Sequence, residues 1–128
     1  MDRACPFTPF RAGSERSEGI IRMIGYAELH CHSNFSLLDG ATHPEDIAMR
    51  AAEHGLAALA ITDHDGLYGA VRFAKACREA GVKPIIGAEL TLEGGHHLVL
   101  LAEDNAGYSN LCRLISHAQL TQDRKSVV

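Results

Sequence analysis

Residues 56–66 read LAALAITDHDG, an apolar run that passes directly into Thr-Asp-His-Asp. The run Leu56–Ile61 does not alternate between apolar and polar residues, which is typical of a strand buried on both faces of a parallel sheet. Residues 62–66 then form the loop that leaves this strand, and a helical pattern begins at about Tyr68. We therefore interpret this stretch as one β–α unit of an α/β protein.

Further strands and helices are predicted on both sides of this unit. The other predicted strands are Gly25–His30, Lys83–Leu90 and His97–Ala102. The predicted helices run from near Pro44 to Gly55, from Tyr68 to Ala80 and from Ala106 to Leu120. Such an order predicts right-handed crossovers and a parallel sheet, with Gly55 and Gly81 as left-handed helix terminators and Gly94-Gly95 as a turn.

Two finer predictions concern the helices. Thr42 and Glu45 have the spacing of a capping box, with Pro44 in the first turn of the helix. In the next helix, the apolar side chains expected to face the core are Val71, Phe73, Ala74 and Cys77.

The composition is that of a folded protein. Of 128 residues, 46% are hydrophobic and 22% are charged, and the net charge is −4 with a pI of about 6.0. This balance argues against a nucleic-acid surface formed by this segment alone, because phosphate binding needs clustered lysine and arginine. No apolar run approaches the roughly 20 residues of a membrane helix. The four dispersed cysteines favour reduced thiols in a cytoplasmic protein.

The two ends of the chain differ from the part between them. Residues 1–23 carry charges and two prolines but no continuous apolar segment, so we expect a disordered leader, with Met23 as an alternative start, and no signal peptide. Residues 123–128, DRKSVV, match one reading frame of a common sequencing adapter, so we expect residues 121–128 to be a non-native or disordered tail. The folded domain is expected at residues 24–120.

Metal-ligand side chains follow three successive predicted strands. His30 and His32 end the first strand, His64 follows the second, and Glu89 ends the third. The carboxyl ends of parallel strands meet at one edge of the sheet, so we expect these side chains to converge. Asp39, in the loop after the first strand, can reach the same place. This set suits Zn²⁺, Mn²⁺ or Fe²⁺, which would activate water toward a phosphoester.

Asp63 and Asp65 flank His64 and have two interpretations. Either carboxylate could hydrogen-bond to a ligating imidazole and orient it. Either could instead cap the following helix. The remaining histidines are expected to lie outside the metal site: His43, His54, His96, His97 and His117.

Four runs of residues around these positions resemble a known family, the PHP (polymerase and histidinol phosphatase) domain. They are Glu28–Ser33, Leu38–Gly40, Ile61–Gly69 and Gly87–Leu90. More narrowly, the chain from about Gly25 to Leu120 resembles the N-terminal PHP domain of bacterial DNA polymerase III α subunits. Three segments are most similar in sequence to the error-prone type: Tyr26–Gly40, His97–Ala102 and Gly107–Leu114.

This resemblance implies a distorted (β/α)7 barrel of parallel strands, truncated here after about four β–α units, and a cluster of up to three metals. It implies His30 and His32 as the first ligand pair, Asp39 and His64 as the next ligands, and Glu89 as a bridging carboxylate. It also implies a parent DNA polymerase that uses DNA, deoxynucleoside triphosphates and Mg²⁺, with other polymerase subunits or a sliding clamp as partners. The polymerase active site is absent from this fragment, so we expect the chain alone to be inactive in polymerisation.

Three functions stay open on these grounds. The chain is a fragment of an error-prone polymerase that acts in translesion replication or DNA repair, or a free-standing phosphatase of the histidinol-phosphatase kind, or a non-catalytic, metal-stabilised scaffold. The polymerase-like sequence of Gly107–Leu114 favours the polymerase fragment.

Overall fold

The computed structural model describes residues 25–120, so the predictions for the leader and the tail lie outside the described residues. One four-stranded sheet has the order β1-β2-β3-β4. Its strands are β1 (Ala27–Glu28), β2 (Ala58–Ile61), β3 (Lys83–Thr91) and β4 (His97–Leu101). The helices are α2 (Pro44–Glu53), α3 (Ala70–Ala80) and α4 (Asn105–Leu120), and a 3₁₀ turn, η1 (Glu93–Gly95), precedes β4. None of these helices is long and apolar enough to span a membrane.

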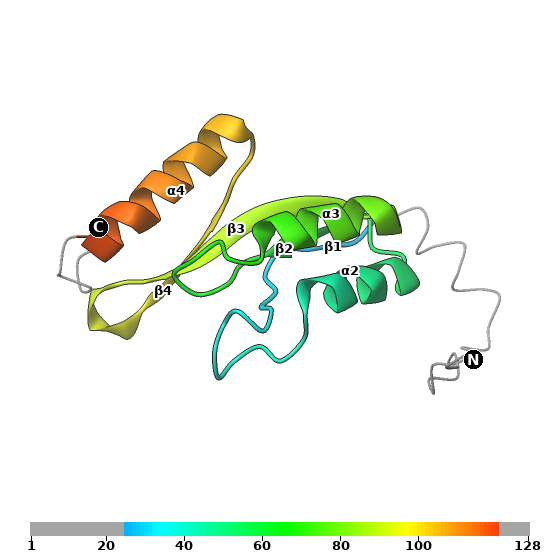
Figure 1. Cartoon of the computed structure of the whole chain (residues 1–128), viewed down its shortest axis with the longest axis horizontal. Helices are drawn as coiled ribbons and strands as arrows, with labels where there is room; N and C mark the ends of the chain where they lie inside the picture. Colours follow the sequence, from blue (N-terminus) through cyan, green and yellow to red (C-terminus); the bar gives the residue numbers. More distant parts are fainter. Residues whose placement is uncertain (1–24, 121–128) are drawn as a thin grey trace.

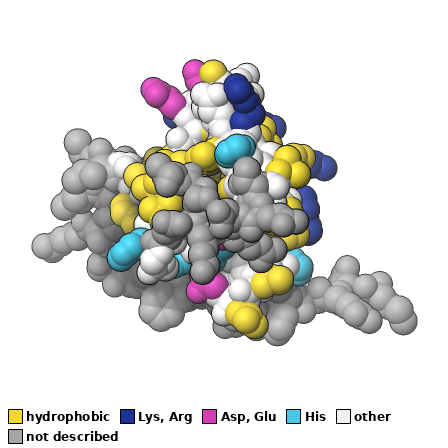
Figure 2. All heavy atoms as spheres, turned by 90° about the vertical axis from the view of Figure 1, so that its left-hand side faces the viewer, with side chains coloured by type: hydrophobic (Ala, Val, Ile, Leu, Met, Phe, Trp, Pro, Cys, Tyr) yellow, Lys and Arg dark blue, Asp and Glu magenta, His cyan; other side chains and the backbone are white. Residues whose placement is uncertain are grey.

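The elements form a curled, mostly parallel half-barrel with helices packed on it. In Figure 1, α2 and α3 lie together on one side of the sheet, and α4 lies at the opposite end of the molecule, beside β4. Hydrophobic side chains reach the surface at the α4 end (Figure 2). The exposed hydrophobic residues of β4 and α4 include Leu98, Leu101, Tyr108 and Leu120.

The strands β1, β2 and β3 pair in parallel, as predicted. The prediction of a fourth parallel strand is wrong, because β4 pairs with β3 in the antiparallel sense. Only residues 92–96 join the two strands, and so short a link cannot contain the crossover helix that a parallel neighbour requires. Gly94 and Gly95 make the turn in the left-handed region, with φ of 81° and 80°.

Two small cores hold the helices on the sheet. The buried residues of the first are Ala48, Ala51, Leu59, Ile61, Phe73, Cys77 and Val82. Those of the second are Ala88, Leu90 and Leu111. All four residues of β2 are buried, which confirms the interpretation of its apolar run.

The alternation of side chains along β3 places one charged residue opposite the second core. Ala88 and Leu90 pack with Leu111 of α4. Because successive side chains of a strand point to opposite faces, Glu89 projects to the inner face of the curled sheet.

β1 is shorter than predicted. The sequence predicts a strand at Gly25–His30, whereas pairing with β2 covers only Ala27–Glu28. His30 and His32 therefore lie beyond the strand, where other contacts must set their positions.

The start of α2 also departs from the prediction. The N-cap is His43, without a side-chain cap bond. The predicted capping box fails because this start puts Glu45 at the second helical position and not at the third. Glu45 instead pairs with Arg72 of α3, whose Nε and Nη2 lie 2.6 and 3.0 Å from its carboxylate oxygens.

The ends of the helices follow the glycine prediction. Gly55 and Gly81 adopt left-handed conformations, with φ of 68° and 76°. Within α3, Phe73 is fully buried as predicted, but Val71 is 78% exposed. The buried face of α3 is formed by Ala70, Phe73 and Cys77, and Val71 lies outside this face.

Replacing Phe73 with alanine is expected to lower the free energy of unfolding by about 3–5 kcal/mol, because it leaves a cavity in the first core. The matched control is Val71→Ala in the same helix, for which we expect a change within about 0.5 kcal/mol. Urea denaturation followed by circular dichroism measures both. Equal losses in the two variants would contradict this packing of α3.

Candidate metal centre

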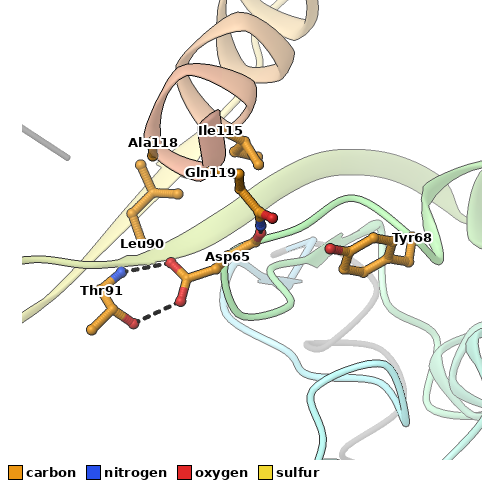
Figure 3. A pocket seen from close by; sticks show the side chains of 7 residues that line it. All are labelled: Asp65, Tyr68, Leu90, Thr91, Ile115, Ala118 and Gln119. Carbon is orange, nitrogen blue, oxygen red and sulfur yellow. Dashed lines mark hydrogen bonds between the residues drawn. The ribbon is translucent and has the colours of Figure 1, made fainter. Parts of the chain in front are cut away.

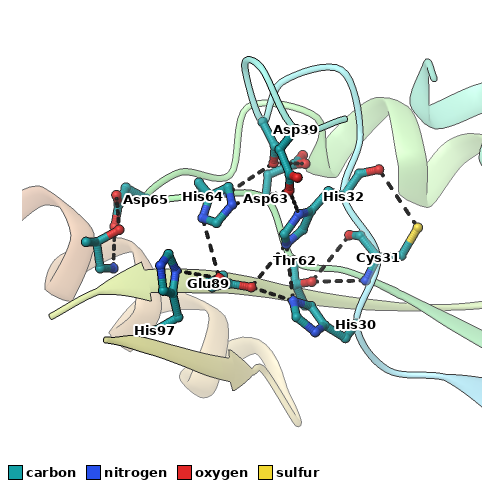
Figure 4. A network of polar contacts seen from close by, with 12 residues as sticks. His30, Cys31, His32, Asp39, Thr62, Asp63, His64, Asp65, Glu89 and His97 are labelled. Carbon is teal, nitrogen blue, oxygen red and sulfur yellow. Dashed lines mark hydrogen bonds and ion pairs between the residues drawn. The ribbon is translucent and has the colours of Figure 1, made fainter. Parts of the chain in front are cut away.

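Glu89 lies at the centre of a group of polar side chains on the inner face of the sheet (Figure 4). It does so because the pairing of β2 with β3 continues past β2 as a parallel bridge between His64 and Glu89. The amide of Asp65 donates to the carbonyl of Glu89 at 2.9 Å, and the amide of Glu89 donates to the carbonyl of Asp63 at 3.1 Å. The backbone thereby fixes His64 beside Glu89.

Four imidazoles surround the carboxylate of Glu89. Its Oε2 contacts Nε2 of His30 and lies 3.1 Å from Nε2 of His32. Its Oε1 lies 2.6 Å from Nδ1 of His97 and 3.6 Å from Nδ1 of His64. The Glu89 side chain is only 7% exposed, so this carboxylate is the buried part of the group.

Asp39 closes the group from the loop after β1. Its Oδ2 contacts Nδ1 of His32 and lies 3.4 Å from Nε2 of His64. The structure thus brings together all five residues that the sequence singles out as ligands. We refer to these residues and His97 as the Glu89 cluster: His30, His32, Asp39, His64, Glu89 and His97.

The expectation that His97 lies outside the group is wrong. In the antiparallel pairing of β3 with β4, His97 is opposite Thr91, which shares a face of β3 with Glu89. The two glycines after β3 were the sequence signal for this hairpin, and the prediction of a parallel fourth strand obscured it. His43 and His54 lie at the two ends of α2, outside the cluster, as predicted.

The hydrogen bonds of Asp63 and Asp65 differ from both predicted roles. Asp63 accepts hydrogen bonds from Ser33 and Ser36, and not from an imidazole of the cluster. Asp65 accepts from the amide and the hydroxyl of Thr91, both at 2.9 Å. Neither residue caps a helix, since α3 begins without a side-chain cap. Both carboxylates therefore hold loops and strand ends in place.

The two carboxylates of the cluster are held in their charged forms. Burial acts to raise the pKa of Glu89, but its contacts with His30 and His32 and the charge of His64 outweigh burial, so this pKa lies below its ordinary value. The hydrogen bond with His32 lowers the pKa of Asp39. Both side chains are therefore available as anionic ligands near neutral pH.

Three overlapping sets of donor atoms in the cluster could each hold a metal ion. The donor atoms within each set lie within 4.8 Å of one another. The sets are His30, His32 and Glu89; His32, Asp39 and His64; and His64, Glu89 and His97. Imidazole and carboxylate together are the donors that Zn²⁺, Mn²⁺ and Fe²⁺ accept. A small cavity of about 280 Å³ opens beside His30, His32 and Asp39.

A larger cavity of about 410 Å³ lies on the α4 side of β3 (Figure 3). Its lining residues are Asp65, Tyr68, Leu90, Thr91, Ile115, Ala118 and Gln119. The one charged side chain among them, Asp65, is bonded to Thr91. The Glu89 cluster is therefore the stronger candidate for a site with metal chemistry.

Comparison with curated proteins gives relatives of known name. The chain is 53% identical over 103 residues to an error-prone DNA polymerase of Symbiobacterium thermophilum. This match covers 80% of this chain and 10% of the polymerase. It is 51% identical over 105 residues to an error-prone DNA polymerase of Pseudomonas aeruginosa, and this match covers 82% of this chain and 10% of that polymerase. The chain thus spans about a tenth of the length of these relatives.

Solved structures share the fold. One, from Bifidobacterium adolescentis and described as a metal-dependent phosphoesterase, has a TM-score of 0.56 and 25% identity, and covers 77% of this chain and 34% of that one. An amidohydrolase from Chromobacterium violaceum has a TM-score of 0.53 and 30% identity. This match covers 77% of this chain and 36% of the amidohydrolase. The PHP domain family itself matches residues 28–127, which include every residue of the Glu89 cluster. The chain therefore belongs to the PHP domain family.

Proposed function

We propose that the Glu89 cluster is a divalent metal centre of the phosphoesterase type. The observation that carries this proposal is the overlap of three donor sets around one buried carboxylate. All six residues of the cluster are proposed ligands. Their mixture of imidazole and carboxylate suits Zn²⁺ or Mn²⁺, with Fe²⁺ as a third option.

Divalent ions at this centre would supply the positive charge that activates water and stabilises the leaving oxygen of a phosphoester. Glu89 belongs to two of the donor sets, so its carboxylate would supply ligand atoms to both. His30 and Asp39 are 52% and 54% exposed, so these two side chains form the rim that a substrate would approach.

We further propose that this PHP domain is part of a longer error-prone DNA polymerase. The support is the identity of 53% and 51% to two proteins of that name over four fifths of this chain. The whole protein would act in the cytoplasm and add deoxynucleotides to a primer during replication past damage or during repair. It would use DNA, deoxynucleoside triphosphates and Mg²⁺, and would assemble with other polymerase subunits or a sliding clamp.

A free-standing phosphatase is the second candidate. It is favoured by the likeness of the fold to the Bifidobacterium adolescentis protein, described as a metal-dependent phosphoesterase. The same cluster would then act on a small phosphorylated metabolite.

Substitution of His64 by alanine is expected to weaken binding of Zn²⁺ or Mn²⁺ by at least the roughly 10–100-fold that follows loss of a residue supporting a metal ligand. Isothermal titration calorimetry of the 128-residue chain measures this affinity. The matched control is His54→Ala, because His54 lies at the end of α2 and outside the cluster. Equal affinities of the two variants would exclude His64 as a ligand.

Glu89→Gln is expected to change how the stability of the metal-free chain depends on pH. The folded-state pKa of Glu89 lies below the ordinary value of 4.5, so its contribution is fully present above that pH and is lost as the pH falls through the folded-state pKa. On acidification below about pH 4.5, the wild-type chain should therefore lose stability more steeply than the variant. Thermal melts in EDTA test this, and parallel curves would contradict it.

The DNA that follows codon 122 in the native locus separates the polymerase from the phosphatase. The polymerase proposal predicts that the reading frame continues to about eight times the length of this chain, since matches that cover about four fifths of the chain make up 10% of its curated relatives. A stop codon near ~250 residues, the size of one α/β barrel, would favour the phosphatase. A natural stop directly after Val128 would exclude both the longer protein and the adapter origin of the tail.

A further inference from the structure

Half of the Glu89 cluster lies on two segments outside regular secondary structure, residues 30–32 and the loop of residues 33–40. β1 ends at Glu28, two residues before His30, and no described strand or helix contains His32 or Asp39. Precise placement of metal ligands requires a rigid support, and here the strand ladder does not supply it. The support must come from contacts made by these segments themselves.

Thr62, the first residue after β2, provides one such contact. It is fully buried, and its amide donates to the carbonyl of Cys31 at 2.8 Å. Its Oγ1 accepts a hydrogen bond from the amide of Cys31 at 3.1 Å and lies 3.3 Å from the Cys31 carbonyl. Cys31 stands between His30 and His32, so Thr62 fixes the backbone that carries both imidazoles.

Asp63 provides a second contact, with the loop beyond the two histidines. It is only 2% exposed. Its Oδ1 accepts hydrogen bonds from the amide of Ser33 at 2.7 Å and from the hydroxyl of Ser36 at 2.8 Å. Its Oδ2 accepts from the hydroxyl of Ser33 at 2.7 Å. Ser36 Oγ in turn accepts from the amide of His64 at 3.1 Å, so one carboxylate joins the two loops.

The position of Asp39 follows from the same two serines. The amide of Ser36 donates to the carbonyl of Ser33 at 3.0 Å, and the amides of Asp39 and Gly40 donate to the carbonyl of Ser36 at 3.1 and 2.9 Å. At Gly40 a side chain would overlap with the Ser33 carbonyl. The loop is therefore tightly folded around Ser33 and Ser36, and Asp63 holds both.

We propose that Asp63 is a positioning residue for the metal centre, because it clamps the Asp39 loop to the segment that carries His64. The inference rests on the metal centre proposed above. The three donors to the Asp63 carboxylate are neutral, and a buried charge with neutral partners is costly unless its geometry is well satisfied. Such a carboxylate imposes fixed positions on the groups that donate to it, which is the property that a ligand support requires.

Three variants of the 128-residue chain test this role. Asp63→Ala removes the clamp. Asp63→Asn keeps its size, and its amide oxygen still accepts from Ser33 and Ser36. Phe73→Leu is the stability control, because it loosens the first core without touching the cluster. The measurements are the affinity for Zn²⁺ by chelator competition, and hydrogen–deuterium exchange of the amides of residues 33–40.

Asp63→Ala is expected to weaken Zn²⁺ binding by roughly 10–100-fold, the usual effect of losing a support of metal ligands. Asp63→Asn should stay within a few-fold of the wild-type affinity, and Phe73→Leu should bind as the wild type does while melting at a lower temperature. Exchange at residues 33–40 should rise in Asp63→Ala and not in Phe73→Leu.

The proposal is overturned if Asp63→Ala binds Zn²⁺ as tightly as the wild type, or loses no more affinity than Phe73→Leu. Unchanged exchange at residues 33–40 overturns it too, and this measurement needs no metal. If the wild-type chain itself binds no Zn²⁺, the metal centre fails, and the exchange data alone then decide whether Asp63 holds the loop.

Discussion

The pairing of His64 with Glu89, one step past the end of β2, is the contact on which the rest of the site depends. Two backbone hydrogen bonds, of 2.9 and 3.1 Å, extend the parallel ladder into the loop and set the two side chains next to each other. Alternation along β3 then turns Glu89 inward while Ala88 and Leu90 pack against α4. Packing of the outer helices thus fixes which face of the sheet carries the charge.

Much of this arrangement could be predicted from the sequence, because it follows from local rules. The unbroken apolar run of β2 specifies a strand buried on both faces, and parallel strands deliver their following residues to one edge. Those two rules predict that His30, His32, His64 and Glu89 gather at one edge, although contacts beyond the short β1 set the final positions of His30 and His32. Gly55 and Gly81 specify helix ends for an equally local reason, since a left-handed residue there is easiest for glycine.

The remaining features depend on contacts between distant residues. The direction of β4 is decided by a five-residue link, and His97 enters the cluster only through that direction. Glu45 pairs with Arg72, on another helix, and not with the N-cap of its own helix. Asp63 faces Ser33 and Ser36 and not an imidazole, since the short β1 leaves their loop free to fold back over the end of β2. Apart from the short link before β4, with its two glycines, none of these features follows from spacing along the chain.

In the proposed metal centre, six side chains from separate β–α segments share divalent ions around Glu89. Anomalous X-ray diffraction from crystals of the chain soaked in Mn²⁺ tests it most directly. We expect anomalous peaks within about 2.0–2.3 Å of the Glu89 carboxylate and of the nearest histidine nitrogens. Anomalous peaks only at other places on the molecule, or none in a crystal whose cluster is intact, would contradict it.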